Sequence, residues 1–374
     1  MTGRPRITLV AASLDILGGQ GVQARALVEA LRGDGYRVAF VPINPRFPRG
    51  LRWLRRIPYA RTLVNQLLYV PSLTRLARAD VVHVFSASFW SFLLAPVPAM
   101  LAAKLFRARV VLHYHSGEAG EHLSRWGVLV HPWLRLADVI VVPSDYLKGV
   151  FAEHGHTARV IRNVVDLSRF AWRERSSLQP RLISTRNLEP YYRVDVVLDA
   201  FRRLRAAVPQ ATLTVAGSGS EETRLRGMAG EGVRFVGAVD PAAMPALLNE
   251  ADIFVNASVV DNQPVSLLEA FAAGLPVVST PTGDIAAMVR HEETGVLVAP
   301  LDAGAIAAAV VSLLRDPAHA RSVARQARAE VDRYTWAAVR GEWASVYDDG
   351  AAPAAVPVEA PARDIESWNS ARSR

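Results

Sequence analysis

The sequence contains no cysteine, and its only lysines among 374 residues are Lys104 and Lys148. The absence of cysteine excludes disulfide bonds and thiolate ligands for metal ions. Because lysine is so scarce, the formal net charge of +8 comes almost wholly from arginine. No recognition motif of a nucleic-acid-binding module accompanies this charge, and we therefore predict no nucleic-acid partner.

The sequence also lacks a recognisable secretory signal and a convincing membrane span. Arg4 and Arg6 lead directly into a strand-like apolar run at 7–10, which is not the pattern of a signal peptide. Residues 81–103 carry no formal charge and are long enough to span a bilayer, but they include Pro96 and Pro98. Their β-branched start predicts a buried strand at 81–85, followed by a helix at 89–105. A cytoplasmic location is the expectation that follows.

What the sequence does contain is an alternation of β-branched runs and helical patterns over most of its length. The 51% of residues that are apolar allow large buried cores. Such alternation is typical of an α/β fold whose parallel sheets carry helices on both faces. There are too many strand candidates for one small sheet, so two doubly wound domains are predicted. The candidates are 7–12, 37–43, 81–85, 110–115, 139–143, 158–165, 182–185, 212–216, 233–236, 253–257, 276–280 and 296–298.

The most informative segment runs from Asp261 to residue 278. Within it, Pro264 suits the first position of a helix, and Gly274 suits the left-handed residue just past the helix end. Asp261 is therefore expected in the loop before a short helix and Glu269 in its second turn, with the free amide groups of the helix start between them. This pattern suits an enzyme that holds a phosphate-bearing sugar by its hydroxyl groups. An ordinary capped core helix accounts for the same apolar residues.

Other segments place glycine, histidine or arginine after a predicted strand, where doubly wound folds bind ligands. The pair Gly18 and Gly19 lets a ligand approach the backbone close to a helix start. His115 ends another strand, and we expect His113 to point to the opposite face. The guanidinium of Arg186, at the end of a strand in the second half, suits a bidentate contact with a diphosphate.

Together these segments resemble the family 4 retaining glycosyltransferases, two-domain enzymes of the GT-B fold, over about residues 6–347. The resemblance rests on two acids separated by seven residues, followed by a helix that ends in Ala-Gly-x-Pro-Val-Val at 273–278. The first acid is Asp261, where the family has glutamate. The family also has a lysine five or six residues after its diphosphate-binding arginine. Those positions hold Tyr191 and Tyr192, and Arg193 is the candidate replacement.

The resemblance implies a domain arrangement and a set of site residues. A Rossmann-like acceptor-binding domain would occupy 1–170, and a Rossmann-like nucleotide-sugar-binding domain would occupy 171–333. A helix at 334–349 would return to the first domain, and the Ala/Pro-rich tail at 350–374 is predicted to be disordered. His115, Asp261 and Arg186 would be the catalytic residues. The donor would be bound by Gly18, Gly19, Arg186, Arg193, Gly217, Val239, Asn262, Pro264, Val265, Ser266 and Glu269.

The activity implied is retaining transfer from a nucleotide-diphosphate sugar to a glycan, lipid-linked or small-molecule acceptor, in cell-surface polysaccharide or glycoconjugate biosynthesis. No cofactor is expected beyond this co-substrate. No metal is expected either, because an Asp-x-Asp motif is absent and no third ligand accompanies the two histidines at 113 and 115. A nucleotide-sugar epimerase of the same fold and a non-catalytic glycan- or nucleotide-binding relative remain alternatives. A nicotinamide site is disfavoured, because a loop at 13–17 separates the first strand from the glycines.

One further stretch, at 46–61, interleaves arginines with aromatic and aliphatic side chains. A basic, aromatic-bearing amphipathic segment can lie on an anionic membrane surface. A solvated, arginine-rich helix face accounts for the same pattern. Peripheral contact with the inner face of a membrane is therefore one of two interpretations. The residues concerned are Arg46, Phe47, Arg49, Leu51, Arg52, Trp53, Leu54, Arg55, Arg56, Ile57, Tyr59 and Arg61.

Overall fold

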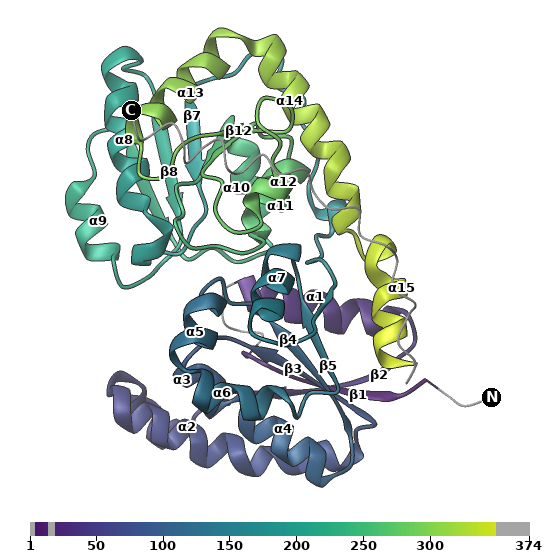
Figure 1. Ribbon diagram of the computed structural model, residues 1–374. Helices are drawn as coiled ribbons and strands as arrows, with labels where there is room; N and C mark the ends of the chain where they lie inside the picture. The colour runs from purple at the N-terminus through teal and green to yellow at the C-terminus, as the bar shows by residue number, and fades with distance from the viewer. Residues whose placement is uncertain (1–3, 14–18, 349–374) are drawn as a thin grey trace.

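The computed structural model describes residues 4–13 and 19–348, and it contains two six-stranded parallel sheets, one above the other in Figure 1. The strand order of the first sheet is β2-β1-β3-β4-β5-β6, and that of the second is β12-β11-β10-β7-β8-β9. All twelve predicted strands are present, and the α/β fold with two doubly wound domains is confirmed. The predicted tail at 350–374 lies outside the described residues. The strands are β1 (Arg6–Ala11), β2 (Arg37–Pro42), β3 (Val81–Ser86), β4 (Arg109–Tyr114), β5 (Val139–Val142), β6 (Arg159–Val160), β7 (Arg181–Ser184), β8 (Thr212–Ala216), β9 (Val233–Gly237), β10 (Ile253–Val255), β11 (Val277–Ser279) and β12 (Val296–Leu297).

Helices connect the strands of the first domain and cover both faces of its sheet. They are α1 (Gly19–Gly33), η1 (Arg49–Arg56), α2 (Pro58–Ser72), η2 (Leu73–Arg78), α3 (Trp90–Leu94), α4 (Pro96–Leu105), α5 (Ala119–Arg125), α6 (Gly127–Leu134) and α7 (Asp145–Glu153). The single helix predicted at 89–105 is wrong, because the chain breaks at Ala95 between α3 and α4. Pro96 has no backbone N–H to continue the turns of α3, so a new helix starts there, and Pro98 lies in the first turn of α4, where no N–H donor is needed.

The second domain follows the same plan. A short crossing segment, which includes η3 (Leu167–Arg169), leads into it. Its helices are η4 (Pro190–Tyr192), α8 (Val194–Ala207), α9 (Glu222–Met228), α10 (Met244–Glu250), α11 (Val265–Ala272), α12 (Ile285–Met288), α13 (Ala303–Arg315), α14 (Pro317–Glu330), η5 (Val331–Tyr334) and α15 (Trp336–Tyr347).

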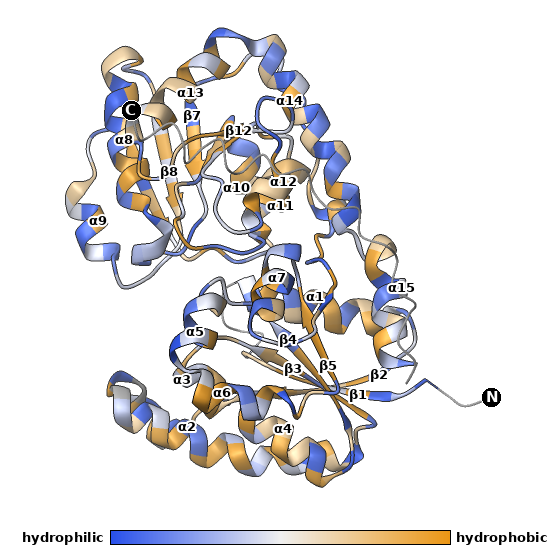
Figure 2. Ribbon diagram, viewed as in Figure 1, coloured by the Kyte–Doolittle hydropathy of each residue, from blue (hydrophilic) through white to orange (hydrophobic). Residues whose placement is uncertain are grey.

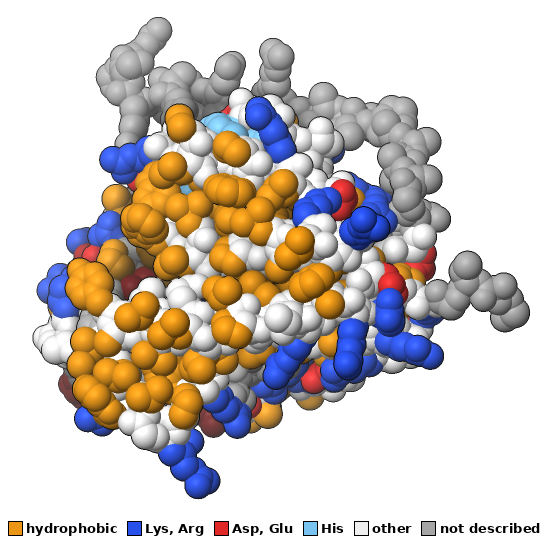
Figure 3. All heavy atoms as spheres, turned by 90° about the horizontal axis from the view of Figure 1, so that it is seen from below, with side chains coloured by type: hydrophobic (Ala, Val, Ile, Leu, Met, Phe, Trp, Pro, Cys, Tyr) orange, Lys and Arg blue, Asp and Glu red, His pale blue; other side chains and the backbone are white. Residues whose placement is uncertain are grey.

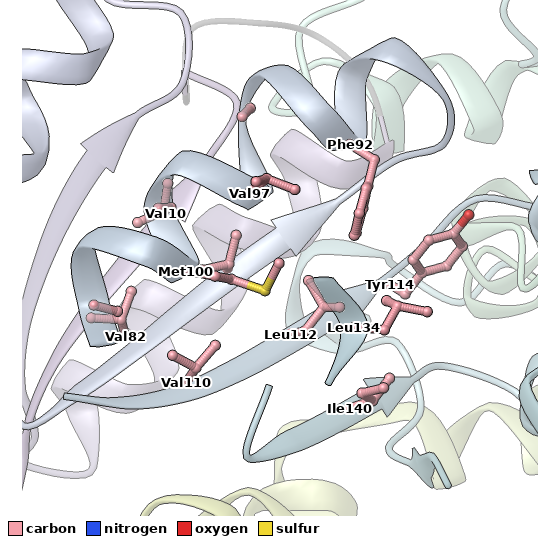
Figure 4. Packing of buried hydrophobic residues seen from close by; sticks show 14 of the residues in the cluster. Val10, Val82, Phe92, Val97, Met100, Val110, Leu112, Tyr114, Leu134 and Ile140 are labelled. Carbon is pink, nitrogen blue, oxygen red and sulfur yellow. The ribbon is translucent and has the colours of Figure 1, made fainter. Parts of the chain in front are cut away.

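The strands are apolar on both faces because helices bury both faces of each sheet. Figure 2 shows this as orange along the strands, whereas the helices mix orange and blue. Every residue of β3 is buried. On one face of the first sheet, side chains of β3 and β4 pack against Met100 and Val97 of α4 and Phe92 of α3 (Figure 4). These interlocked layers fix the carboxyl ends of the strands, which face the second domain.

The last helix, α15, leaves the second domain and packs on the first sheet (Figure 1). Its residues Val339, Trp343, Val346 and Tyr347 are buried in one cluster with apolar residues of β1, β3 and β4. The chain therefore crosses between the two sheets twice, once before β7 and once before α15. Among the described residues, no helix is long and apolar enough to cross a membrane.

Candidate active site

A cleft of about 620 Å³ opens between the two domains, at the carboxyl ends of their strands. The first domain contributes the start of α1 and the loop after β4, and the second contributes the loops after β7, β8, β9 and β10 with the start of α11. The cleft brings together most of the predicted site residues. They are Gly19, His115, Arg186, Gly217, Val239, Asp261, Asn262, Pro264, Val265, Ser266 and Glu269. Gly18 lies outside the described residues.

Helix α11 has the ends that its sequence predicts, apart from a shift of one residue at its start. Pro264 is not the first helical residue but the residue before it, with φ −70° and ψ 119°. Its carbonyl oxygen nevertheless accepts a hydrogen bond of the first helical turn, from the amide of Leu267. Gly274 follows the helix with φ +75°, the left-handed conformation predicted for it. Asp261 consequently stands before the helix start, and Glu269 lies in the second turn.

Arg186 is held at the N-terminal end of α11 by three contacts. Its guanidinium donates to Asp261 Oδ2 over 2.6 Å and to Ser266 Oγ over 2.8 Å. It also lies 4.1 Å from the centre of the Tyr192 ring, close enough for a cation–π contact. Only 7% of Arg186 is exposed, and its Nε has no partner among the described residues. A buried guanidinium fixed in this way presents positive charge to the cleft with little conformational freedom to lose on binding.

Glu269 is the second acid of the motif, and it reaches the cleft without a polar partner. Its side chain is 8% exposed, and no described residue donates a hydrogen bond to it. Burial raises the pKa of this carboxyl to about 7, and only the charge of Arg169 acts in the opposite direction. A buried acceptor that has no donor in the described part of the chain suits hydroxyl groups supplied by a ligand.

Arg193 is not part of the cleft. It adopts a left-handed conformation (φ +49°) as the residue before α8, and its guanidinium pairs with Asp195 at 2.8 and 2.9 Å. The structure therefore does not bring Arg193 into the cleft, and its replacement of the family's lysine stays a prediction. Tyr191 and Tyr192, at the positions where that lysine was sought, do line the cleft. Among the described lining residues Arg186 is the only arginine or lysine.

The glycines around the cleft serve two different purposes. A Cβ on Gly19 would meet no atom of the residues at 4–13 or 19–348 within 4 Å, so these leave room for a ligand to approach the backbone. A Cβ on Gly217 would stand 2.2 Å from the carbonyl oxygen of Arg186, so glycine is required there for two loops to cross. Gly117 of the first domain also lies close to Asp261 of the second, since a Cβ there would be 2.8 Å from the Asp261 carbonyl oxygen. The two domains are thus in backbone contact beside the acid pair.

The loop before α11 is also tied to the first domain by hydrogen bonds that the sequence did not indicate. Ser144 Oγ donates to Asn262 Oδ1, so this predicted donor-binding residue is already engaged by the first domain. Gln263 Oε1 accepts from the amide of Asn163, and Gln263 Nε2 donates to the carbonyl oxygen of Pro143. Amide side chains carry no sequence pattern for such contacts, and their partners here are about a hundred or more residues away.

His115 lies in the cleft as predicted, but the expected orientation of His113 is wrong. Side chains two residues apart along a strand point to the same side. The rings of His113 and His115 are accordingly neighbours, with centroids 4.0 Å apart, and both contact Phe85. Burial lowers the pKa of His115 to about 3, so its imidazole is neutral at ordinary pH.

The arrangement as a whole can bind an anionic leaving group and a polyhydroxyl group side by side. Arg186 and the free amides at the start of α11 favour negative charge. The carboxylates of Asp261 and Glu269 can accept from hydroxyl groups, and neutral His115 lines the cleft from the first domain. Among the described residues, no group of three or more His, Cys, Asp or Glu side chains is placed to hold a metal ion.

Known proteins resemble both halves of the chain. Residues 17–169 match the family model described as Glycosyltransferase Family 4, and residues 179–316 match that described as Glycosyl transferases group 1. The glycogen synthase of Mycobacterium tuberculosis is 35% identical over 290 residues, which are 72% of this chain and 69% of that protein. The phosphatidyl-myo-inositol mannosyltransferase of Mycobacterium leprae is 29% identical over 361 residues, 90% of this chain and 94% of that protein.

Solved structures of low sequence identity show the same fold. HepE of Anabaena, in complex with UDP-glucose, is 17% identical and superposes with a TM-score of 0.74, over 92% of this chain and 99% of that one. Sucrose-phosphate synthase of Thermosynechococcus elongatus is 20% identical with a TM-score of 0.72, over 92% and 98% of the two chains.

Proposed function

This chain belongs to the group 1 glycosyl transferases, family 4, and from that premise we propose that it is a retaining enzyme that uses a nucleotide-diphosphate sugar. The predicted family, the GT-B fold and the transfer of glycosyl groups are confirmed. The acceptor proposed is a glycan, a lipid-linked glycan or a small molecule. The biological setting proposed is cell-surface polysaccharide or glycoconjugate biosynthesis.

The observation that carries the proposal is Glu269, a buried carboxyl that reaches the cleft and lacks any donor among the described residues. It lies one turn from the helix-start amides that suit a diphosphate, so one rigid helix presents both an anion site and a hydroxyl site. A nucleotide sugar carries a diphosphate flanked by hydroxyl-bearing rings. We propose that Glu269 accepts from the ribose and that Asp261 lies by the sugar.

The chemistry proposed is stabilisation of the departing diphosphate and of positive charge that develops on the sugar. Arg186 and the amides of Val265 and Ser266 would receive the diphosphate, and fixed donors of this kind lower a barrier because they need no rearrangement. Asp261 is paired with Arg186, so we assign it no role as a covalent nucleophile. Retention would then follow if the acceptor attacks the face from which the diphosphate leaves. We propose that neither a cofactor nor a metal takes part.

The first test is a thermal-shift screen of nucleotide-diphosphate sugars against the parent protein, Glu269→Ala and Glu118→Ala. Glu118 lines the same cleft from the first domain, so it is a matched acid outside the proposed donor site. A donor at about a hundred times its Kd should add ~2.7 kcal/mol of stability to the parent. The shift should persist in Glu118→Ala and vanish in Glu269→Ala. A shift that survives in Glu269→Ala would refute the assigned site.

Products distinguish the proposed transferase from its rivals. Transfer with the donor's anomeric configuration kept, as read by NMR of the product, supports retention, whereas an inverted product refutes it. Conversion of the donor to an isomer without any acceptor identifies an epimerase. Donor binding with no turnover against a panel of glycan and lipid acceptors identifies a non-catalytic relative.

The structure also supports a lipid-facing surface on the first domain, opposite the second. Figure 3 shows apolar side chains gathered over this face with arginines near them. The predicted stretch at 46–61 is not one continuous helix, because η1 ends at Arg56 and α2 begins at Pro58. Within this stretch the exposed large apolar residues are Leu51, Trp53, Ile57 and Tyr59. Beyond it they are Leu63, Leu67, Val70, Trp90, Leu101, Leu105, Val128 and Leu129.

We propose that this surface rests on an anionic membrane and that a lipid-linked acceptor enters along α3. Trp90 of α3 is 65% exposed, while the adjacent Ser91 lines the cleft, so this helix joins the outer surface to the site. Tyr59 is 91% exposed on α2. Co-sedimentation with phosphatidylglycerol vesicles should be weakened by Tyr59→Ser together with Leu63→Ser, and little pelleting is expected with phosphatidylcholine. Equal pelleting of parent and variant would refute this surface.

A further inference from the structure

A line of three buried side chains and the partly buried His115 runs through the first domain, from α15 to the cleft. Tyr347 Oη lies 2.6 Å from His83 Nδ1, and His83 Nε2 lies 3.2 Å from His113 Nδ1. The ring of His113 is then 4.0 Å, centre to centre, from that of His115. His115 faces the cleft, so the line joins the last helix of the chain to the proposed site.

The three imidazoles of this line are neutral, and that makes the hydrogen bonds directional. Burial lowers the pKa of His83 and of His115 to about 3 and moves that of His113 in the same direction. A neutral imidazole carries one N–H and one acceptor nitrogen. If Tyr347 donates to His83 Nδ1, the proton of His83 is on Nε2 and is donated to His113 Nδ1. The proton of His113 is then on Nε2, so one hydroxyl fixes the tautomer of two rings.

His115 is positioned by contacts with neighbouring rings, and no described residue forms a hydrogen bond with its Nε2. Phe85 stacks on it at 5.1 Å with an interplanar angle of 9°, and His113 contacts it with an angle of 49°. The Nε2 atoms of His113 and His115 are both buried and have no partner among the described residues. The tautomer of His113 therefore decides whether an N–H or a lone pair faces the surroundings of His115.

Packing alone does not require this arrangement. Burying polar ring nitrogens costs free energy that leucine or phenylalanine in the same positions would avoid. The neighbouring Trp343 of α15 packs against both His83 and His113 at 5.1 Å, so apolar contact between α15 and the sheet is already present. Hydrogen-bonded polar side chains stand in this line where apolar ones would be less costly. This points to a role in the site at the end of the line.

We propose that Tyr347, His83 and His113 are positioning residues that set the orientation and electrostatic surroundings of His115, so that α15 completes the active site of the first domain. The inference rests on the proposed transferase activity, with His115 as one of the catalytic residues that the family resemblance implies. Donor binding, which we assign to the second domain, should be independent of the line.

The test compares Tyr347→Phe with Tyr36→Phe in the full-length protein. Tyr36 packs against Tyr347 at the same end of α15, and its hydroxyl donates to Asp348, but it has no atom in the line. Tyr347→Phe should lower kcat roughly tenfold, the scale on which loss of a partner that orients a histidine matters, and it should leave the donor-induced thermal shift unchanged. Tyr36→Phe should leave both unchanged. His83→Phe keeps a ring without nitrogens, and we expect it to match Tyr347→Phe in kcat.

A spectroscopic readout separates this inference from the proposed function. Long-range ¹⁵N–¹H spectra of histidine-labelled protein report the tautomer of each imidazole without any turnover. In the parent, His83 and His113 should each show a single tautomer, and Tyr347→Phe should redistribute the protons of both. Unchanged tautomers in that variant, or a kcat equal to that of Tyr36→Phe, would overturn the inference. A parent protein that never transfers sugar, yet shows the locked tautomers, would overturn the proposed function alone.

Discussion

Replacing Glu269 with glutamine should make the protein more stable at alkaline pH while it removes donor binding. Burial raises the pKa of this carboxyl from an ordinary 4.5 to about 7. Between these two values the folded protein holds the proton more tightly than the unfolded chain, so stability falls as the pH rises through this window. A rise of the pKa from 4.5 to about 7 corresponds to about 3 kcal/mol, and this whole cost is present above about pH 8.

The free-energy cost of ionising the buried Glu269 carboxyl can be measured by urea denaturation of parent and variant at about pH 5 and about pH 8. Glutamine has nearly the same shape as glutamate but no charge, so Glu269→Gln should gain about 3 kcal/mol at the higher pH and about 1 kcal/mol at the lower. Glu269→Asp is the matched control, because it keeps a buried carboxyl and with it the dependence on pH. A gain from Glu269→Gln that is equal at both pH values would refute the assigned cost of burial.

Donor binding gives a second readout of the same carboxyl. Hydrogen bonds from ribose hydroxyls favour the ionised form, so binding should lower the pKa of Glu269 and release protons near pH 7. Donor affinity should therefore rise with pH through this range in the parent. Titration calorimetry in two buffers of different ionisation enthalpy would reveal the proton. In Glu269→Asp the donor-induced shift should shrink, since the oxygen atoms retreat by one methylene. No proton release, together with tight donor binding, would show that the ligand does not contact this carboxyl.

Three further changes test the site and its support. Arg186→Lys keeps the positive charge but loses the planar guanidinium that contacts Asp261. In a transfer assay kcat should fall by roughly 100-fold. An unchanged kcat would show that Arg186 does not stabilise the leaving group. Gln263→Leu leaves the amide of Asn163 and the carbonyl of Pro143 without their hydrogen-bond partner at the domain contact. Thermal unfolding should show that the free energy of unfolding falls by about 1–3 kcal/mol. Gly274→Ala places a methyl group 2.7 Å from the Trp172 ring, at a residue in the left-handed conformation. Calorimetry should show that the free energy of unfolding falls by at least about 1 kcal/mol. An unchanged midpoint of thermal unfolding would contradict the expected strain.

Local patterns in the sequence were sufficient for much of the fold. Alternating β-branched and helical runs located the strands of both sheets, because strands buried on two faces must be apolar throughout. Pro264 and Gly274 located α11 to within a residue, since each has a conformational preference that neighbours in the sequence do not alter. The family and the positions of Arg186, Asp261 and Glu269 in the cleft followed from the same segments.

Contacts between distant residues were beyond the reach of such patterns. Sequence spacing did not show that Arg193 pairs with Asp195, because the left-handed turn before α8 aims its guanidinium away from the cleft. Nor did it show the domain contact through Gln263, whose partners Asn163 and Pro143 come from the other half of the chain.

The sequence by itself thus determined where the chain forms strands and helices, and which family it belongs to, because both depend on short-range preferences and ordered motifs. Only the tertiary structure decided which polar side chains meet. The line from Tyr347 through His83 to His113 joins residues 264 and 30 positions apart, and no periodicity relates them. Their meeting depends on how α15 packs across the first sheet, which is a property of the folded core and not of any one segment.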